Sequence, residues 1–65
     1  MSFKEWLYGE LVNDGFIDED YSMDDINKDS LLSMTDMDEM DFENYHDQFE
    51  EHCQAINEEP EWDVE

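Results

Sequence analysis

The sequence predicts a small all-α domain of three to four helices with a long acidic C-terminal helix. Apolar side chains recur at three- and four-residue spacing, and helix-capping patterns precede these apolar runs. Only one Pro and two Gly interrupt the chain. Because 65 residues cannot divide their apolar side chains between two cores, we expect one helical domain over residues 1–57 and an acidic tail over residues 58–65.

The first predicted helix begins after Ser2. Ser2 and Glu5 form the S-x-x-E pattern of a capping box. Gly15 is expected to end the helix, since glycine readily adopts the left-handed conformation past a helix end. Phe16 and Ile17 would then pack back on the helix. The apolar stripe, including its margins, consists of Phe3, Trp6, Leu7, Tyr8, Leu11 and Val12.

The middle of the chain, residues 22–34, has a less regular apolar pattern than the first helix. Ser22 with Asp25 predicts a second N-cap and a short helix that includes Ile26. Ile26 and Leu31 fit no single helical stripe. The pattern therefore leaves open whether residues 22–34 form one helix or two.

The longest helix is predicted from about Asp36 to Asn57. Thr35 with Asp38 predicts its N-cap, and Asp36, Asp38 and Glu39 would favour the positive end of the helix dipole. Apolar residues follow close to a three-four alternation. They are Met37, Met40, Phe42, Tyr45, Phe49, Cys53 and Ile56.

The charge of the chain restricts its partners. Twenty-two Asp and Glu face two Lys, which gives a formal net charge of -20 at pH 7. Such a charge steers a molecule toward cationic partners and excludes nucleic acid and anionic membranes as direct ligands. High charge is also typical of disorder, but an aromatic content of 14% and a hydrophobic content of 38% favour a folded domain.

A cytoplasmic protein is expected. Cys53 is the one cysteine and cannot form an internal disulfide, which is typical of reducing compartments. The N-terminus has no basic-then-apolar signal pattern, and no segment approaches the roughly 20 apolar residues of a membrane span. A homodimer is compatible with so small a core.

Carboxylates line one face of the longest predicted helix. Such like charges destabilise a helix by a few tenths of a kcal/mol per pair, and almost no Lys relieves them. A net charge of -20 equals that of roughly ten base pairs, and a helix close to 30 Å long approaches one duplex turn of about 34 Å. Solubility or a high-salt environment is the alternative explanation. The predicted partner-binding residues are Asp36, Glu39, Glu43, Asp47, Glu50 and Glu51, with Tyr45 and Trp62 as exposed aromatic anchors.

In size, charge and aromatic content the chain resembles the DNA-mimic inhibitors that phages and mobile elements use against host defence. These include anti-restriction and anti-CRISPR proteins. The class shares no motif or fold, so the resemblance is one of strategy. It implies an inhibitor that occupies the nucleic-acid-binding site of a basic protein such as a nuclease, CRISPR effector, restriction enzyme or repair nuclease. For a phage-encoded inhibitor, the location would be the bacterial host cytoplasm.

Two other functions stay open. Asp29-Ser30-Leu31 is similar to the D-S-L motif of acyl carrier proteins, with Ser30 as the prosthetic-group site, although Thr35 and Asp36 are expected to start a new helix soon after it. An acidic adaptor or assembly protein is the other alternative. No residues organise a catalytic site, so neither an enzyme nor a cofactor is expected. His46, Glu50 and Cys53 lie at i, i+4 and i+7 near one helical edge, a spacing that could ligate a metal ion. No metal site is expected, however, because Cys53 continues the apolar stripe, which favours a core cysteine and a surface histidine.

Overall fold

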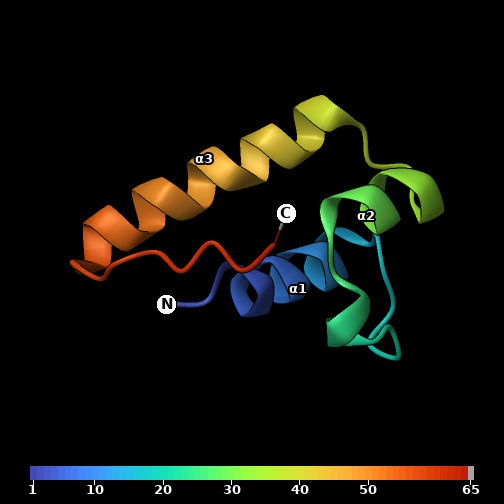
Figure 1. The fold of residues 1–65 in the computed structure, drawn as a ribbon, viewed down its shortest axis with the longest axis horizontal. Helices are drawn as coiled ribbons and strands as arrows, with labels where there is room; N and C mark the ends of the chain where they lie inside the picture. The colour runs from blue at the N-terminus through green and yellow to red at the C-terminus, as the bar shows by residue number, and fades with distance from the viewer. Residues whose placement is uncertain (65) are drawn as a thin grey trace.

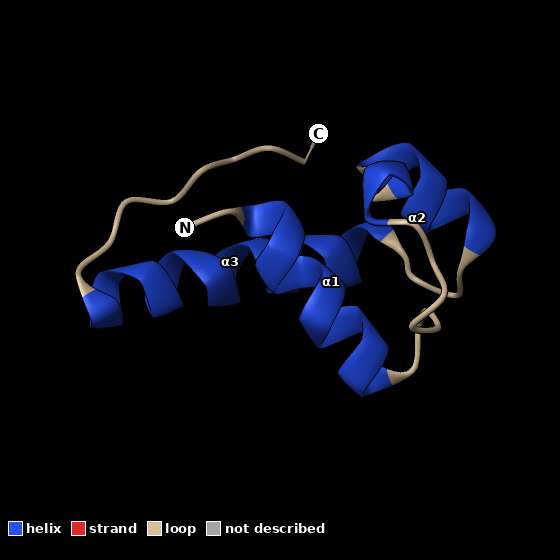
Figure 2. Cartoon of the chain, turned by 90° about the horizontal axis from the view of Figure 1, so that it is seen from below, coloured by secondary structure: helices blue, strands red, loops and turns tan. Residues whose placement is uncertain are grey.

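The computed structural model describes residues 1–64, and within them the predicted all-α class is confirmed (Figure 1). The elements are α1 (Phe3–Asp14), a 3-10 turn η1 (Met23–Asp25), α2 (Lys28–Met34) and α3 (Glu39–Ile56). Helix α3 packs across α1, while η1 and α2 lie together at one end of the pair (Figures 1 and 2). Among these residues, no helix has the length and apolar content that crossing a bilayer requires.

Both ends of α1 are where the sequence predicts them. The Ser2 side chain accepts a hydrogen bond from the Glu5 backbone N–H at 3.3 Å. Gly15 adopts the left-handed conformation with φ of 86°, and the Phe16 N–H donates to the Leu11 carbonyl at 2.9 Å. This closure turns the chain back, so that Ile17 is buried in the core.

The segment 22–34 forms two separate elements. Ser22 lies at the predicted N-cap position, although its side chain makes no capping hydrogen bond, and the short helix that follows it is the single 3-10 turn η1. Helix α2 is capped by Asn27, whose Oδ1 accepts from the Ser30 N–H at 2.8 Å. Ile26 lies between the two elements in extended conformation and is only 1% exposed. Because Ile26 fills the core from this extended position, no continuous helix crosses it.

Helix α3 begins three residues later than predicted. Its N-cap is Asp38, which forms a capping box with Asp41, and the Asp41 N–H donates to Asp38 Oδ1 at 2.8 Å. The predicted Thr35 cap is wrong because the Thr35 hydroxyl donates to the Leu31 carbonyl and ends α2. Asp36 therefore precedes the helix and does not lie in its first turn. Asn57 ends α3 with φ of 61°, as the predicted boundary requires.

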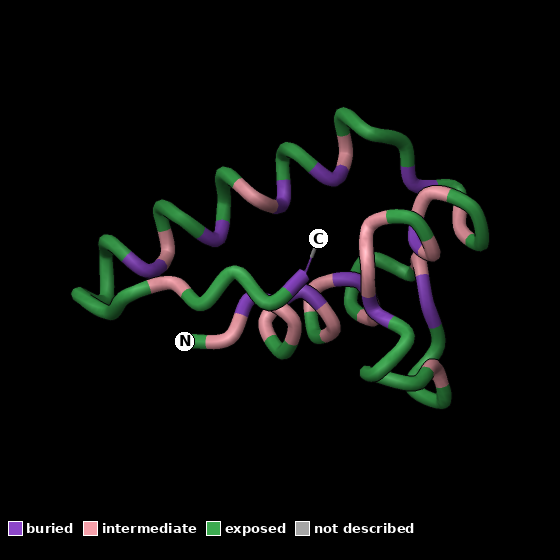
Figure 3. Tube along the Cα trace, viewed as in Figure 1, coloured by how far each residue is buried: buried purple, intermediate pink, exposed green. Residues whose placement is uncertain are grey.

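The core is built mainly from facing stripes of α1 and α3. Figure 3 shows the buried positions of α3 on the side that faces α1. Met40 and Ile56 were predicted in this stripe but are 70% and 45% exposed. Met40 lies nine residues before Phe49, which is two and a half turns and therefore the opposite side of the helix. The buried core residues are Phe3, Leu7, Leu11, Ile17, Ile26, Leu31, Met37, Phe42, Tyr45, Phe49, Cys53 and Val64.

The segment after α3 packs against the N-terminus, and Val64 joins the core at 8% exposure. The backbone N–H groups that open α1 need partners outside the helix. Phe3 donates to the Glu61 carbonyl at 3.0 Å, and Lys4 donates to Asp63 Oδ1 at 2.8 Å. Residues 58–64 of the predicted tail are thus part of the folded domain, while Glu65 lies outside the described residues.

Candidate acidic binding face

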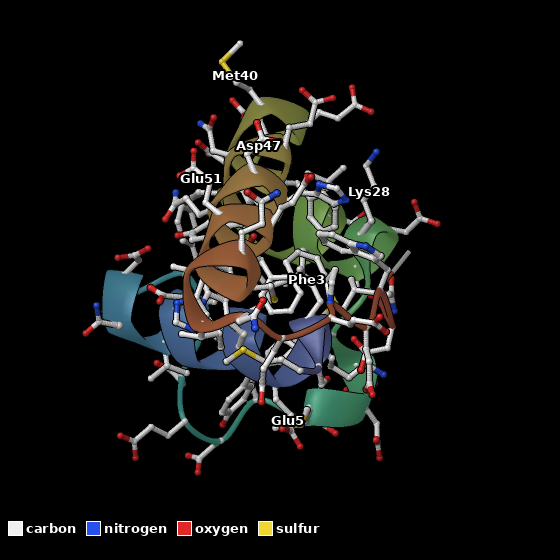
Figure 4. All side chains as sticks on the ribbon, turned by 90° about the vertical axis from the view of Figure 1, so that its left-hand side faces the viewer. Phe3, Glu5, Lys28, Met40, Asp47 and Glu51 are labelled. Carbon is white, nitrogen blue, oxygen red and sulfur yellow. The ribbon has the colours of Figure 1, made fainter. Side chains whose placement is uncertain are left out.

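Five exposed carboxylates occupy one half of the solvent-facing side of α3, and we call them the acidic edge. At 100° per residue, they fall within about 120° of the helix circumference. Neutral side chains such as Asn44 and Gln48 occupy the other half. Figure 4 shows Asp47 and Glu51 on the outer side of α3, with Phe3 enclosed between α3 and α1. The acidic edge consists of Glu39, Glu43, Asp47, Glu50 and Glu51.

The acidic edge approaches the linear charge density of one nucleic-acid strand. From Glu39 to Glu51 the helix rises by about 18 Å, so the five carboxylates are separated on average by about 4.5 Å of axis. A strand of duplex DNA carries one phosphate per roughly 3.4 Å. The longest dimension of the whole molecule is 32 Å, close to one duplex turn of about 34 Å.

One cation contacts the acidic edge. Lys28 Nζ of α2 lies 3.4 Å from Glu39 Oε1, and this is the only ion pair among residues 1–64. The same ammonium lies 5.7 Å from the centre of the Phe42 ring. Because the Glu39 side chain is 73% exposed, water screens the pair strongly. The other members of the edge have no hydrogen-bonding or ionic partner within the described residues.

The two predicted aromatic anchors differ in exposure. Tyr45 is only 7% exposed, so its prediction as an exposed aromatic is wrong, although its place in the apolar stripe is confirmed. Its hydroxyl donates to Asp14 at the end of α1. Burial raises the pKa of Tyr45 well above its ordinary value, and the Asp14 carboxylate raises it further. Tyr45 faces inward because it falls between Phe42 and Phe49 on the core side of α3.

Trp62 is 41% exposed and stacks on His46 of α3, with ring centres 3.9 Å apart and planes 12° apart. It also packs edge-on against the buried Phe3 ring at 5.2 Å. Trp62 therefore lies beside the acidic edge, held there by the C-terminal segment.

Asp36 is exposed in the connection that precedes α3. The predicted site residues are thus brought together on one side of α3, except Tyr45, which is buried, and Asp36, which lies before the helix.

A hollow of about 390 Å³ lies between α2 and the acidic edge. It joins an aromatic ring, carboxylates and a lysine from two helices. Its lining residues are Lys28, Phe42, Glu43, His46 and Asp47. Sequence reasoning missed this feature because Lys28 lies on a different helix, and no local pattern indicates that α2 approaches Phe42.

His46, Asp47 and Glu50 are the residues best placed to hold a metal ion. Their ligand atoms all lie within 4.8 Å of one another on α3. Imidazole with carboxylates suits borderline or hard divalent cations. The combination of His46 and Glu50 with Cys53 does not form, because Cys53 is 1% exposed and belongs to the core.

Ser30 of the D-S-L motif lies in the first turn of α2, a helix of seven residues. Its backbone N–H is occupied by the Asn27 cap, and the residue is half-buried. The helix ends at Met34, so the long helix that follows the motif in acyl carriers is not present here.

Comparison of the chain with protein-family models, with curated proteins and with solved structures gives no match.

Proposed function

We propose that the protein inhibits a basic nucleic-acid-binding protein by placing the acidic edge of α3 where a nucleic-acid strand normally lies. The carboxylates would occupy Lys and Arg subsites that hold phosphates. Trp62, exposed beside the edge, would add apolar contact. The target belongs to a class such as nucleases, restriction enzymes or CRISPR effectors.

The linear charge density of the acidic edge is the observation that carries this proposal. Four i, i+3 or i, i+4 carboxylate pairs occur along it, and each such pair costs a few tenths of a kcal/mol. An ordinary soluble surface mixes charges of both signs. Among residues 1–64, only the solvent-screened ion pair of Lys28 with Glu39 relieves this repulsion. So small a domain keeps these carboxylates together although they repel one another. This favours a function in which their electrostatic field attracts a cationic partner.

Affinity capture with a nucleic-acid competitor tests the proposal. The immobilised chain is incubated with bacterial lysate, with and without an excess of duplex DNA, and the captured proteins are identified by mass spectrometry. We expect nucleic-acid-binding proteins that duplex DNA displaces. Captured partners that lack nucleic-acid activity and ignore the competitor would instead support an acidic adaptor. Incubation with a phosphopantetheinyl transferase tests the acyl-carrier alternative, since the intact mass would rise by the mass of the added group on Ser30.

Charge reversal locates the binding surface. The triple variant Glu43→Lys, Asp47→Lys and Glu50→Lys should abolish binding to the captured protein, by more than about 100-fold, while helicity measured by circular dichroism is kept. Wild-type binding should also weaken steeply as salt rises from 50 mM to 500 mM, because the Debye length shrinks from about 14 Å to about 4 Å. An affinity that salt leaves unchanged would contradict the electrostatic mechanism.

The matched control reverses three carboxylates of the connector between α1 and η1. Asp18→Lys, Glu19→Lys and Asp20→Lys change the net charge by the same amount at exposed positions far from the acidic edge in sequence. We expect this control to retain most of the affinity. Equal losses in both variants would show that net charge, and not the acidic edge, determines binding.

A further inference from the structure

The hollow between α2 and the acidic edge has a volume and a lining that suit the binding of a side chain. At about 390 Å³ it falls within the range of roughly 300–1,000 Å³ that ligand-binding clefts occupy. Phe42 supplies an aromatic wall at one side, and Glu43 and Asp47 contribute carboxylates one helical turn apart. Aromatic and anionic groups are thus presented together at one place on an otherwise convex helix.

Lys28 shows where a cation lies at this hollow. Its ammonium is 5.7 Å from the Phe42 ring centre and 3.4 Å from Glu39, so it combines a cation–π contact with an ion pair. Figure 4 shows Lys28 rising from α2 beside α3. The ion pair lies at the Glu39 end. Glu43 and Asp47, which also line the hollow, have no cationic partner within the described residues.

We propose that this hollow receives an arginine side chain of the partner protein. The inference rests on the proposed function for the identity of the partner as a basic protein. A guanidinium is planar, so it can stack flat on an aromatic face and donate two parallel hydrogen bonds to a carboxylate, whereas a lysine ammonium is a compact point charge without this planar geometry. Phe42, which is 6% exposed, and His46, whose ring also stacks on Trp62, both line the hollow. Glu43 and Asp47 supply acceptors. The arginine would therefore be the residue that aligns the partner along the acidic edge.

Nuclear magnetic resonance titration of the full chain tests the pocket without the partner. The probe is N-acetyl-arginine amide, and the control is N-acetyl-citrulline amide, which has the same shape but a neutral urea group. EDTA is present so that no metal ion binds at His46, Asp47 and Glu50. We expect saturable shifts at the five lining residues with the arginine probe, and no saturation with citrulline. Shifts spread over all acidic segments of the chain would overturn the proposal.

Two double variants with equal loss of charge separate a pocket from diffuse attraction. Glu43→Gln with Asp47→Asn should weaken arginine binding about tenfold, since both acceptors of the guanidinium are lost. Asp18→Asn with Asp20→Asn should change it less than about twofold, because those side chains lie outside the hollow. Equal weakening in both would overturn the pocket. Both pairs are exposed, and circular dichroism checks that each variant is folded.

Lys28→Met tests whether the internal lysine shares the cation position. The substitution keeps an apolar stem over Phe42 and removes the competing ammonium. We expect arginine binding to become about two- to fivefold tighter, the usual size of an exposed cation–π contact. Unchanged or weaker binding would show that the two cations do not share one position. Because the probe is a free amino-acid derivative, a failed pocket leaves the lysate capture unaffected, and a failed capture leaves the pocket measurable.

Discussion

Asp38 and Asp63 accept hydrogen bonds from backbone N–H groups at the starts of α3 and α1, whereas Glu43, Asp47 and Glu51 have no donor within residues 1–64. The capping carboxylates satisfy groups that a helix end leaves without partners, and they lie at the positive end of a helix dipole. The carboxylates of the acidic edge repel one another along the side of α3. The same chemical group thus stabilises the fold at one place and destabilises it at the other, which makes the two sets separable by mutation.

The largest effect in this comparison is expected at Asp63. Asp63→Ala removes the carboxylate that accepts hydrogen bonds from the Lys4 N–H and the Ser2 hydroxyl. The second of these bonds joins residues 61 positions apart. We expect a loss of about 1–2 kcal/mol in the free energy of unfolding, or roughly 4–16 °C in Tm. Chemical denaturation at pH 7 measures it. Glu61→Ala removes one negative charge from the same segment without a side-chain partner, and should cost less than about 0.5 kcal/mol.

The contribution of Asp63 should also depend on pH with a defined sign. Burial opposes ionisation of Asp63, but the hydrogen bonds from Ser2 and Lys4 outweigh it and lower its pKa below the ordinary value of 3.8. A lowered pKa in the folded state means that this stabilisation is present above about pH 4 and is lost as pH falls through the folded-state value. The difference between wild type and Asp63→Ala should therefore shrink steadily as pH is lowered below about 4. A difference that did not change with pH over this acid range would show that packing of the segment, and not the carboxylate, is responsible.

An effect of opposite sign is expected at the acidic edge. Glu43→Gln, Asp47→Asn and Glu51→Gln together relieve four repulsive pairs of about 0.2–0.5 kcal/mol each, so the fold should become more stable by about 1 kcal/mol. Thermal denaturation at low salt measures the gain, which should vanish at 1 M NaCl because the Debye length is then about 3 Å. Asp18→Asn, Glu19→Gln and Asp20→Asn lower the net charge equally and should gain less, since these residues lie outside any helix. If the triple variant at Glu43, Asp47 and Glu51 were less stable than the wild type, the acidic edge would be contributing to the stability of the fold.

How far the sequence predicts this arrangement depends on the range of each interaction. Ser2 and Gly15 cap α1 through residues within four positions, so a local pattern identifies them. Asp63 caps the same helix from the other end of the chain, and no local pattern marks it. Thr35 and Asp38 both precede acidic residues at cap spacing, and the choice between them depends on the Thr35 bond that ends α2. The acidic edge follows from helical periodicity alone, but the hollow beside it requires the tertiary contact between Lys28 and Phe42.

Asp14 is an intermediate case, since its partner is a side chain, the Tyr45 hydroxyl. Tyr45→Phe removes this bond but leaves Asp14 exposed to water, so we expect a loss of only about 0.5–1 kcal/mol in the free energy of unfolding. Tyr21→Phe is the matched control, because the Tyr21 hydroxyl is buried with no hydrogen-bond partner among the described residues, and its removal should be neutral or stabilising.

Since the pKa of Tyr45 is raised by burial and by Asp14, the stabilisation from its hydroxyl is complete below pH 10 and is lost only at more alkaline pH. Spectrophotometric titration should therefore show one tyrosine that ionises well above the ordinary tyrosine pKa of about 10, and Tyr45→Phe should remove that late step. Because Tyr45 faces the core, the same variant should bind the captured partner with unchanged affinity; a weakened complex would place the binding surface on the Asp14 side of α3, away from the acidic edge.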